Sequence, residues 1–135
     1  MGFLAWDEHY SVGVRTMDDQ HKVLFDIVNE LYHAMMKGQA QTITGPLLAK
    51  LVNYTREHFH KEEIAMKATH YPGLAAHTAK HHDLIQQVEK FGERFHRGDI
   101  MLSVDLFNFL RDWLTKHIQH DDKDYGPWMH DHGVR

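Results

Sequence analysis

The feature that most constrains this chain is the stretch His58-Phe-His-Lys-Glu62, where an imidazole and a carboxylate stand four residues apart. On an α-helix two such side chains point the same way, one turn from each other. Comparable steps recur later in the sequence, at His77 and His81 and at His117 and Asp122. The chain is therefore expected to form helices that carry these side chains in register.

Apolar residues that repeat every three or four positions predict four helices. Their expected bounds are about 19–37, 45–67, 72–97 and 103–122. The expected N-caps are Asp18 or Asp19, Thr44 and Ser103, and glycines at positions 38 and 98 follow two of the helices. We expect residues 1–18 to form an extended arm, Tyr125-Gly-Pro127 to break the last helix, and residues 128–135 to form a loose polar tail.

Helices of this length joined by short connections are typical of an all-α, antiparallel up-down-up-down four-helix bundle. A chain of 135 residues without an internal repeat or a low-complexity segment predicts one domain, spanning residues 1–135. No run of about 18 apolar residues is present, so no membrane span is expected. The formal net charge of −4, with both signs interspersed, lacks the electrostatic footprint of a nucleic-acid-binding protein.

Residue types that bind metals fall on the predicted buried face of every helix. The chain contains 14 histidines, and His21 shares its stripe with Leu24 and Phe25. The other stripes carry His58 and Glu62, then His77 and His81, then His117 with Asp122 after it. Burying a charge or an unpaired imidazole costs several kcal/mol. A metal centre between the helices would pair all of these groups at once.

The set of donors indicates the kind of centre. Two carboxylates can bridge two metal ions. Five imidazoles, two bridging carboxylates and a bridging oxo or hydroxo group nearly fill two six-coordinate ions, which leaves one position open for a small ligand. Iron suits mixed imidazole and carboxylate ligation, and the absence of cysteine removes the ligand that thiolate-preferring metals use.

The step from His117 to Asp122 does not fit an ideal helix. Five residues turn about 500°, which leaves Asp122 about 140° away from the direction of His117. We therefore predict a π-bulge or local unwinding after His117. Asp121, four residues from His117, competes for the same role, and helix geometry alone leaves the choice open.

The motifs together resemble the hemerythrin family, and within it the single-domain bacterial members. The matching segments are Asp-Asp-Gln-His21, His58-Phe-His-Lys-Glu62, His77-Thr-Ala-Lys-His81 and His117-Ile-Gln-His-Asp-Asp122. Trp6 and the segment Ser-Val-Gly-Val14 are similar to the opening arm of the family. The resemblance covers nearly the whole chain, and its spacing favours Asp122 over Asp121.

This resemblance implies a non-haem di-iron centre that binds O₂ reversibly. It assigns His77, His81 and His117 to one iron, and His21 and His58 to the iron with the open position. Glu62 and Asp122 would bridge the two ions, together with an oxo or hydroxo group. Large apolar neighbours of the ligands are expected to wall the O₂ pocket, and these are Leu24, Phe59, Trp113, Leu114 and Ile118. Glu63 is expected to be solvated, whereas His82 and His120 are candidates to support the ligands from outside.

The predicted function is O₂ storage, delivery or sensing by a protein that is not an enzyme. The alternatives are a di-iron enzyme acting on O₂, peroxide or nitric oxide, and an iron storage or sensing protein. The expected partners are O₂ and an O₂-consuming enzyme, and the oligomeric state stays open. The sequence shows no signal peptide, so a cytoplasmic location is expected.

Overall fold

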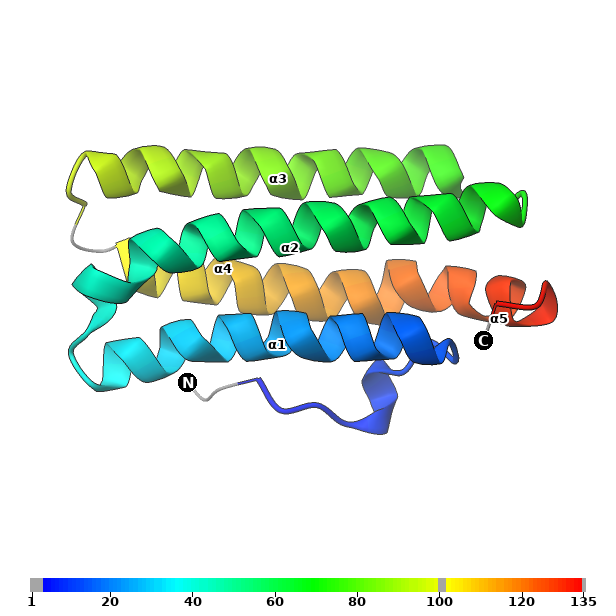
Figure 1. Ribbon diagram of the computed structural model, residues 1–135, viewed down its shortest axis with the longest axis horizontal. Helices are drawn as coiled ribbons and strands as arrows, with labels where there is room; N and C mark the ends of the chain where they lie inside the picture. The colour runs from blue at the N-terminus through cyan, green and yellow to red at the C-terminus, as the bar shows by residue number, and fades with distance from the viewer. Residues whose placement is uncertain (1–3, 100–101, 135) are drawn as a thin grey trace.

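The computed structural model describes residues 4–99 and 102–134, and within them the regular structure is entirely helical (Figure 1). A short 3₁₀ helix, η1, comes first in the chain, and a π-helical segment, η2, interrupts the last long helical stretch. The elements are η1 (Glu8–Tyr10), α1 (Arg15–Met36), α2 (Ala40–Ala68), α3 (Leu74–His96), α4 (Leu102–Lys116), η2 (His117–Asp122) and α5 (Lys123–Asp131).

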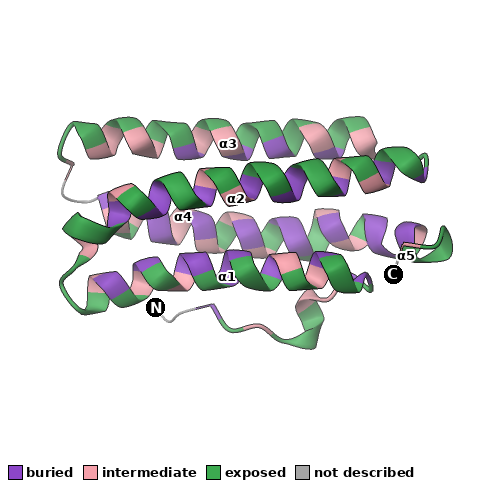
Figure 2. Ribbon diagram, viewed as in Figure 1, coloured by how far each residue is buried: buried purple, intermediate pink, exposed green. Residues whose placement is uncertain are grey.

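The four long helices pack side by side along the molecule and alternate in direction (Figure 1). α1 contacts α2 and α4, and α3 contacts the same two helices from the other side. Each helix turns its buried residues inward and its exposed residues to solvent (Figure 2). The predicted antiparallel four-helix bundle is confirmed.

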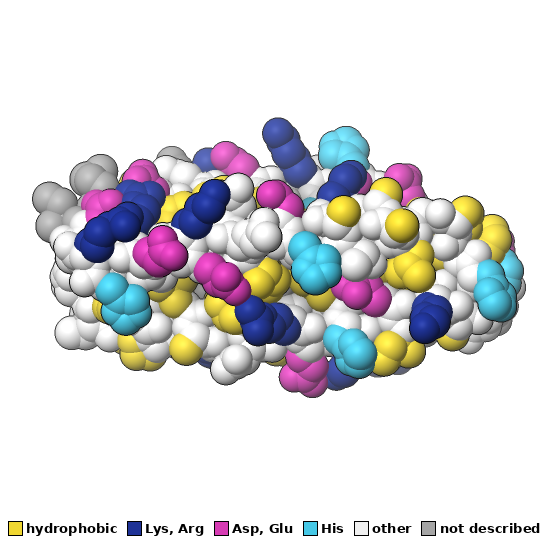
Figure 3. Space-filling model, turned by 90° about the horizontal axis from the view of Figure 1, so that it is seen from above, with side chains coloured by type: hydrophobic (Ala, Val, Ile, Leu, Met, Phe, Trp, Pro, Cys, Tyr) yellow, Lys and Arg dark blue, Asp and Glu magenta, His cyan; other side chains and the backbone are white. Residues whose placement is uncertain are grey.

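The predicted apolar stripes form the core. Leu24, Leu51, Leu84 and Leu106, one on each long helix, are all buried. No helix in the described part of the chain is both long and apolar enough to cross a membrane. The face shown in Figure 3 carries charges of both signs side by side, with histidines scattered among them rather than gathered in one patch.

The first helix begins earlier than predicted. α1 starts at Arg15 after an extended Val14 that makes no side-chain cap, so neither Asp18 nor Asp19 is the N-cap. Asp18 binds the arm instead: its carboxylate accepts hydrogen bonds from the Ser11 hydroxyl (2.6 Å) and the Val12 amide (2.9 Å). This acidic side chain reaches back out of the first turn and fixes the arm against the bundle.

The second helix also begins earlier than predicted. α2 starts at Ala40, so Thr44 lies inside the helix and its hydroxyl donates to the carbonyl of Ala40 (2.6 Å). The same hydroxyl is 2.9 Å from that of Ser103, which lies inside α4 and is not its N-cap in the described helix from Leu102. These two hydroxyls join α2 and α4 rather than capping them.

The C-terminal end is helical rather than loose. α5 runs through Tyr125-Gly-Pro127, so this segment does not break the helix. The side chains of Tyr125 and Met129 are fully buried and hold α5 on the bundle. The indole of Trp128 donates to the Thr69 carbonyl (2.8 Å), which ties α5 to the end of α2. Burial of these large side chains outweighs the helix-breaking tendency of Gly and Pro.

Gly126 permits the closest approach between the arm and α5. A Cβ atom at this position would lie 1.9 Å from the carbonyl oxygen of Val12. We expect Gly126→Ala to lower the free energy of unfolding by about 1–3 kcal/mol, because the arm must shift. Gly92→Ala, inside α3 with no atom within 4 Å of the new Cβ, should instead stabilise by up to ~1 kcal/mol. Urea denaturation of both variants checks this, and equal effects would show that the arm is not packed in this way.

Candidate metal centre

The π-helical segment η2 is the local feature that shapes the centre. It spans His117–Asp122, and the amide of Lys123 bonds to the carbonyl of Ile118, five residues back. In this geometry residues five apart lie on one face, so His117 and Asp122 both point into the bundle and are buried. Asp121 points away and remains 20% exposed. The π-bulge predicted from the misfit of this pair is confirmed.

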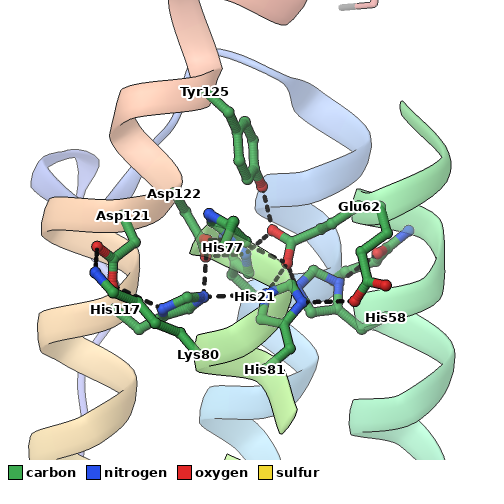
Figure 4. A network of polar contacts seen from close by, with 12 residues as sticks. His21, His58, Glu62, His77, Lys80, His81, His117, Asp121, Asp122 and Tyr125 are labelled. Atoms are coloured by element: carbon green, nitrogen blue, oxygen red, sulfur yellow. Dashed lines mark hydrogen bonds and ion pairs between the residues drawn. The ribbon is translucent and has the colours of Figure 1, made fainter. Parts of the chain in front are cut away.

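Donor atoms from all four long helical stretches meet in the interior (Figure 4). They form two groups that could each hold a metal ion, with all donor atoms of a group within 4.8 Å of one another. The three-histidine group comprises His77, His81, His117, Glu62 and Asp122, and the two-histidine group comprises His21, His58, Glu62 and Asp122. All seven residues singled out in the sequence are buried here.

The two carboxylates lie between the groups. Asp122 Oδ1 is 2.9 Å from His77 Nε2 and 3.0 Å from His117 Nε2, whereas its Oδ2 is 3.0 Å from His21 Nε2. Glu62 Oε1 is 3.2 Å from His81 Nε2, and its Oε2 is 3.3 Å from His21 Nε2. Each carboxylate therefore turns one oxygen toward each group.

Two further carboxylates hold imidazoles of the three-histidine group from outside. His81 Nδ1 lies 2.9 Å from Glu63, and His117 Nδ1 lies 2.9 Å from Asp121, which also pairs with Lys80. Such an acceptor fixes the ring proton on Nδ1 and leaves Nε2 free to face the interior. Glu63 was expected to be solvated, and it is 31% exposed, but its carboxylate also binds His81.

The two-histidine group has a different outer partner. Nδ1 of His58 lies 2.5 Å from the side-chain oxygen of Gln20. The candidates for outer support, His82 and His120, are both exposed. Gln20, Glu63 and Asp121 each directly adjoin a ligand-type residue in the sequence, which is the signal that could have found them. Gln20 and Glu63 each reach the ring of a histidine on a neighbouring helix, whereas Asp121 reaches that of His117 in its own π-helical segment.

Tyr125 is a buried residue of the centre that the sequence did not single out. Its hydroxyl donates to Oε2 of Glu62, and its ring centroid lies 5.5 Å from that of His77. Figure 4 shows it descending from α5 onto the carboxylate. Because the sequence predicted a helix break at Tyr125-Gly-Pro127, Tyr125 received no role in the centre.

Two residues of the predicted pocket wall pack directly on imidazoles. The ring of Phe59 stacks on His81 at 3.6 Å, and that of Trp113 stacks on His117 at 4.4 Å. Both rings therefore hold members of the three-histidine group in place. The other predicted wall residues, Leu24, Leu114 and Ile118, are buried in the core.

The polar atoms at the middle of the centre lack hydrogen-bond partners. Glu62 Oε1, His77 Nε2 and both oxygens of Asp122 are buried without one, although imidazole nitrogens are close. Nε2 of His81 and Nε2 of His117 face each other at 3.2 Å, while both rings donate from Nδ1 to carboxylates. Lone pairs and carboxylate oxygens aimed at common points suit a cation, so this donor set fits bound metal ions.

The pKa values show how strongly the centre attracts positive charge. Burial opposes the protonation of His21, but Asp122 and Glu62 outweigh it and raise the pKa of His21 to about 10. Asp122 likewise raises the pKa of His117 against burial. Burial dominates at His58 and lowers its pKa. The pKa of Glu62 is held well below its usual range, because the surrounding imidazoles overcome the opposing effect of burial.

Known proteins share this sequence and fold over nearly their whole length. The family model described as the hemerythrin HHE cation binding domain matches residues 12–129. The chain is 37% identical over 130 residues to a bacteriohemerythrin of Methylococcus capsulatus, covering 96% of this chain and 98% of that one. It is 28% identical over 121 residues to myohemerythrin-1 of Phascolopsis gouldii, covering 90% of each. A crystal structure of wild-type hemerythrin matches with a TM-score of 0.86 and 35% identity, covering 95% of this chain and 98% of that one. The chain belongs to the hemerythrin family.

Proposed function

We propose that the centre holds two iron ions and binds O₂ reversibly. The observation that carries this proposal is the buried pair Glu62 and Asp122, whose oxygens face both histidine groups. Three of these four oxygens have no hydrogen-bond partner. Two negative charges shared between two donor groups suit a pair of bridged cations. Membership of a family whose model describes cation binding supports the same reading.

The ligands in this proposal are divided unequally. His77, His81 and His117 would hold one ion, His21 and His58 would hold the other, and Glu62 and Asp122 would bridge them with an oxo or hydroxo group. The ion with fewer histidines keeps the open position. Two ferrous ions would supply the electrons needed to bind O₂ reversibly. The side chains supply the positions of the ions and the surroundings in which this happens.

The surroundings favour reversible binding. Leu24, Leu114 and Ile118 are buried next to ligand residues and form the proposed apolar wall. An apolar wall limits the access of water and protons, which slows irreversible oxidation. Tyr125 donates to Glu62 and keeps that carboxylate oriented toward the ions. The chain therefore holds the donors rigid while excluding water.

The set of donors favours O₂ binding over catalysis by a di-iron enzyme. Di-iron enzymes of ferritin-like bundles use several glutamates and two Glu-x-x-His motifs, whereas five of the seven donors here are imidazoles. Fewer anionic donors make higher oxidation states of iron less accessible. We propose that the bound O₂ is stored, sensed or delivered to an O₂-consuming enzyme.

Anaerobic reconstitution with Fe(II) tests the proposal. We expect two irons per chain, and a visible absorption band that forms in air and disappears on removing O₂. Iron content and spectra recorded over repeated cycles are the measurements. A band that decays irreversibly as a substrate is consumed would favour the enzyme, and one iron per chain would contradict the paired ions.

The two adjacent aspartates are expected to behave differently. Asp122→Ala removes a buried carboxylate shared by both groups, so two-iron binding should be lost. Asp121→Ala removes only an outer partner of His117 and should weaken metal affinity by about 10–100-fold. Iron content after dialysis against a chelator, with circular dichroism as a check on folding, distinguishes them. Equal losses in the two variants would refute the bridging role of Asp122.

Protons and metal ions should compete for His21. Because the pKa of His21 is raised in the folded protein, its proton stabilises the fold fully below about pH 6.5. This contribution is lost as the pH rises through about 10. The unfolding free energy of the metal-free protein should therefore fall from about pH 6.5 to about pH 10, while metal affinity rises as the proton leaves. Urea denaturation of the metal-free protein measures the first trend, and chelator competition measures the second. His21→Gln should flatten the stability trend, and an unchanged slope would show that His21 does not cause it.

A further inference from the structure

We propose that the two metal positions fill in order, the three-histidine position first, so that the supply of divalent cation switches O₂ binding on. This rests on the proposed function, because it concerns the same centre. It goes beyond that function by assigning Glu63, Asp121 and Gln20 to unequal affinities of the two positions. These three residues act through the imidazoles and are positioning residues.

The first reason is the number of donors. The three-histidine group offers five residues within 4.8 Å of one another, and the two-histidine group offers four. Glu62 and Asp122 belong to both groups, so the difference is one imidazole. A lone cation entering the empty centre gains one more strong donor at the three-histidine position.

The second reason is the charge outside the ligands. Glu63 and Asp121 place two carboxylates against Nδ1 of His81 and His117. The corresponding partner of His58 is the neutral amide of Gln20, and Nδ1 of His21 has no hydrogen-bond partner in the described chain. A carboxylate on the outer nitrogen makes an imidazole a better donor and attracts the cation, whereas an amide adds no net charge.

The third reason is the rigidity of the rings. His81 is stacked on Phe59, with the ring planes 1° apart, and its outer nitrogen is bound to α2 through Glu63. His117 is stacked on Trp113 and bound to Asp121. Figure 4 shows the contact between His117 and Asp121. Rings already fixed in position lose little conformational freedom when a metal binds.

The fourth reason is the cost of adding the second cation. Glu62 and Asp122 carry two negative charges, which the first divalent ion neutralises. The second ion must then enter a buried site next to the first ion. Glu63 and Asp121 lie beside the three-histidine group, on the far side of the first ion, and so do little to offset the repulsion. Repulsion between charges is strong where water is excluded. The second position is therefore weaker than the first.

Access from solvent favours the same order. A surface cavity of about 430 Å³ between α2 and α3 is lined by Phe59, Glu63 and His81, among others. A second cavity of about 170 Å³ borders His77, Lys80 and Asp121. Both cavities border ligand residues of the three-histidine group next to Glu63 and Asp121, whose negative charges attract a hydrated cation to this side of the centre.

Ordered filling gives the protein a state with one metal ion. In this state the three-histidine position holds an ion, and the two-histidine position, where O₂ would bind, is empty. O₂ binding then requires a free cation concentration high enough to fill the weaker position. The centre is active only where divalent iron is plentiful.

Titration of the metal-free protein with Co²⁺ tests this order. Cobalt(II) serves as a coloured divalent probe, followed anaerobically by calorimetry and by its visible spectrum. We expect two resolved steps of one equivalent each, with dissociation constants at least about 10-fold apart. A single cooperative step of two equivalents would overturn the proposal.

Single substitutions assign each step to its group. Glu63→Gln and Asp121→Asn should each weaken the first step by about 10–100-fold, and Gln20→Ala should weaken only the second. Glu57→Gln is the matched control, because Glu57 is an exposed carboxylate on the same helix that pairs with Lys61. Circular dichroism verifies that each variant is folded before titration. An unchanged first step in both Glu63→Gln and Asp121→Asn, or a first step weakened by Gln20→Ala, would refute the assignment.

The outcome is separable from that of the proposed function. Two ordered steps in a protein that fails to bind O₂ reversibly would keep the loading order and remove the proposed function. Reversible O₂ binding with one cooperative loading step would keep the proposed function and remove the loading order. The cobalt titration itself does not involve O₂, so the two results are measured independently.

Discussion

The structure depends on two carboxylates buried among imidazoles at the centre of the bundle. Glu62 and Asp122 are nearly inaccessible to solvent, and their oxygens face nitrogens at 2.9–3.4 Å, most without the geometry of a hydrogen bond. Such charges are tolerated only when positive charge compensates them. In the metal-free protein a proton on His21 provides part of this positive charge, because the pKa of His21 is raised. Bound cations would provide all of it.

This requirement explains the irregular parts of the fold. The π-helical segment turns Asp122 into the bundle while keeping His117 there, and so disrupts the regular hydrogen bonding of a long helix. Such segments are rare, and they frequently occur at functional sites. The same turn sends Asp121 outward to bind His117 from behind, and it starts α5, which brings Tyr125 over Glu62. One local distortion therefore places residues on both sides of the ligands.

Much of this arrangement could be predicted from the sequence. Spacings of three and four residues placed His21, His58 and His81 on buried faces, and the misfit of His117 with Asp122 predicted the π-helix. The choice between Asp121 and Asp122 as the ligand needed the family resemblance, because helix geometry alone did not exclude either residue. The structure turns Asp122 inward, as that resemblance implied.

Other features depend on contacts between segments that are distant in the sequence. α5 forms despite Gly126 and Pro127 because Tyr125 and Met129 are buried against the bundle, which local propensity does not reveal. The role of Glu63 depends on a histidine 18 residues later and on another helix. The early start of α1 depends on Asp18 binding the arm rather than capping the helix. In each case tertiary packing decided against the local signal.

The most direct test of the account is anomalous diffraction at the iron edge from crystals of the reconstituted protein. The account predicts two iron positions bridged by Glu62 and Asp122. Nε2 of His77, His81 and His117 should bind one ion, and Nε2 of His21 and His58 the other. Asp121 should remain outside, bound to His117. A single iron position, or an iron bound by Asp121 in place of Asp122, would contradict it.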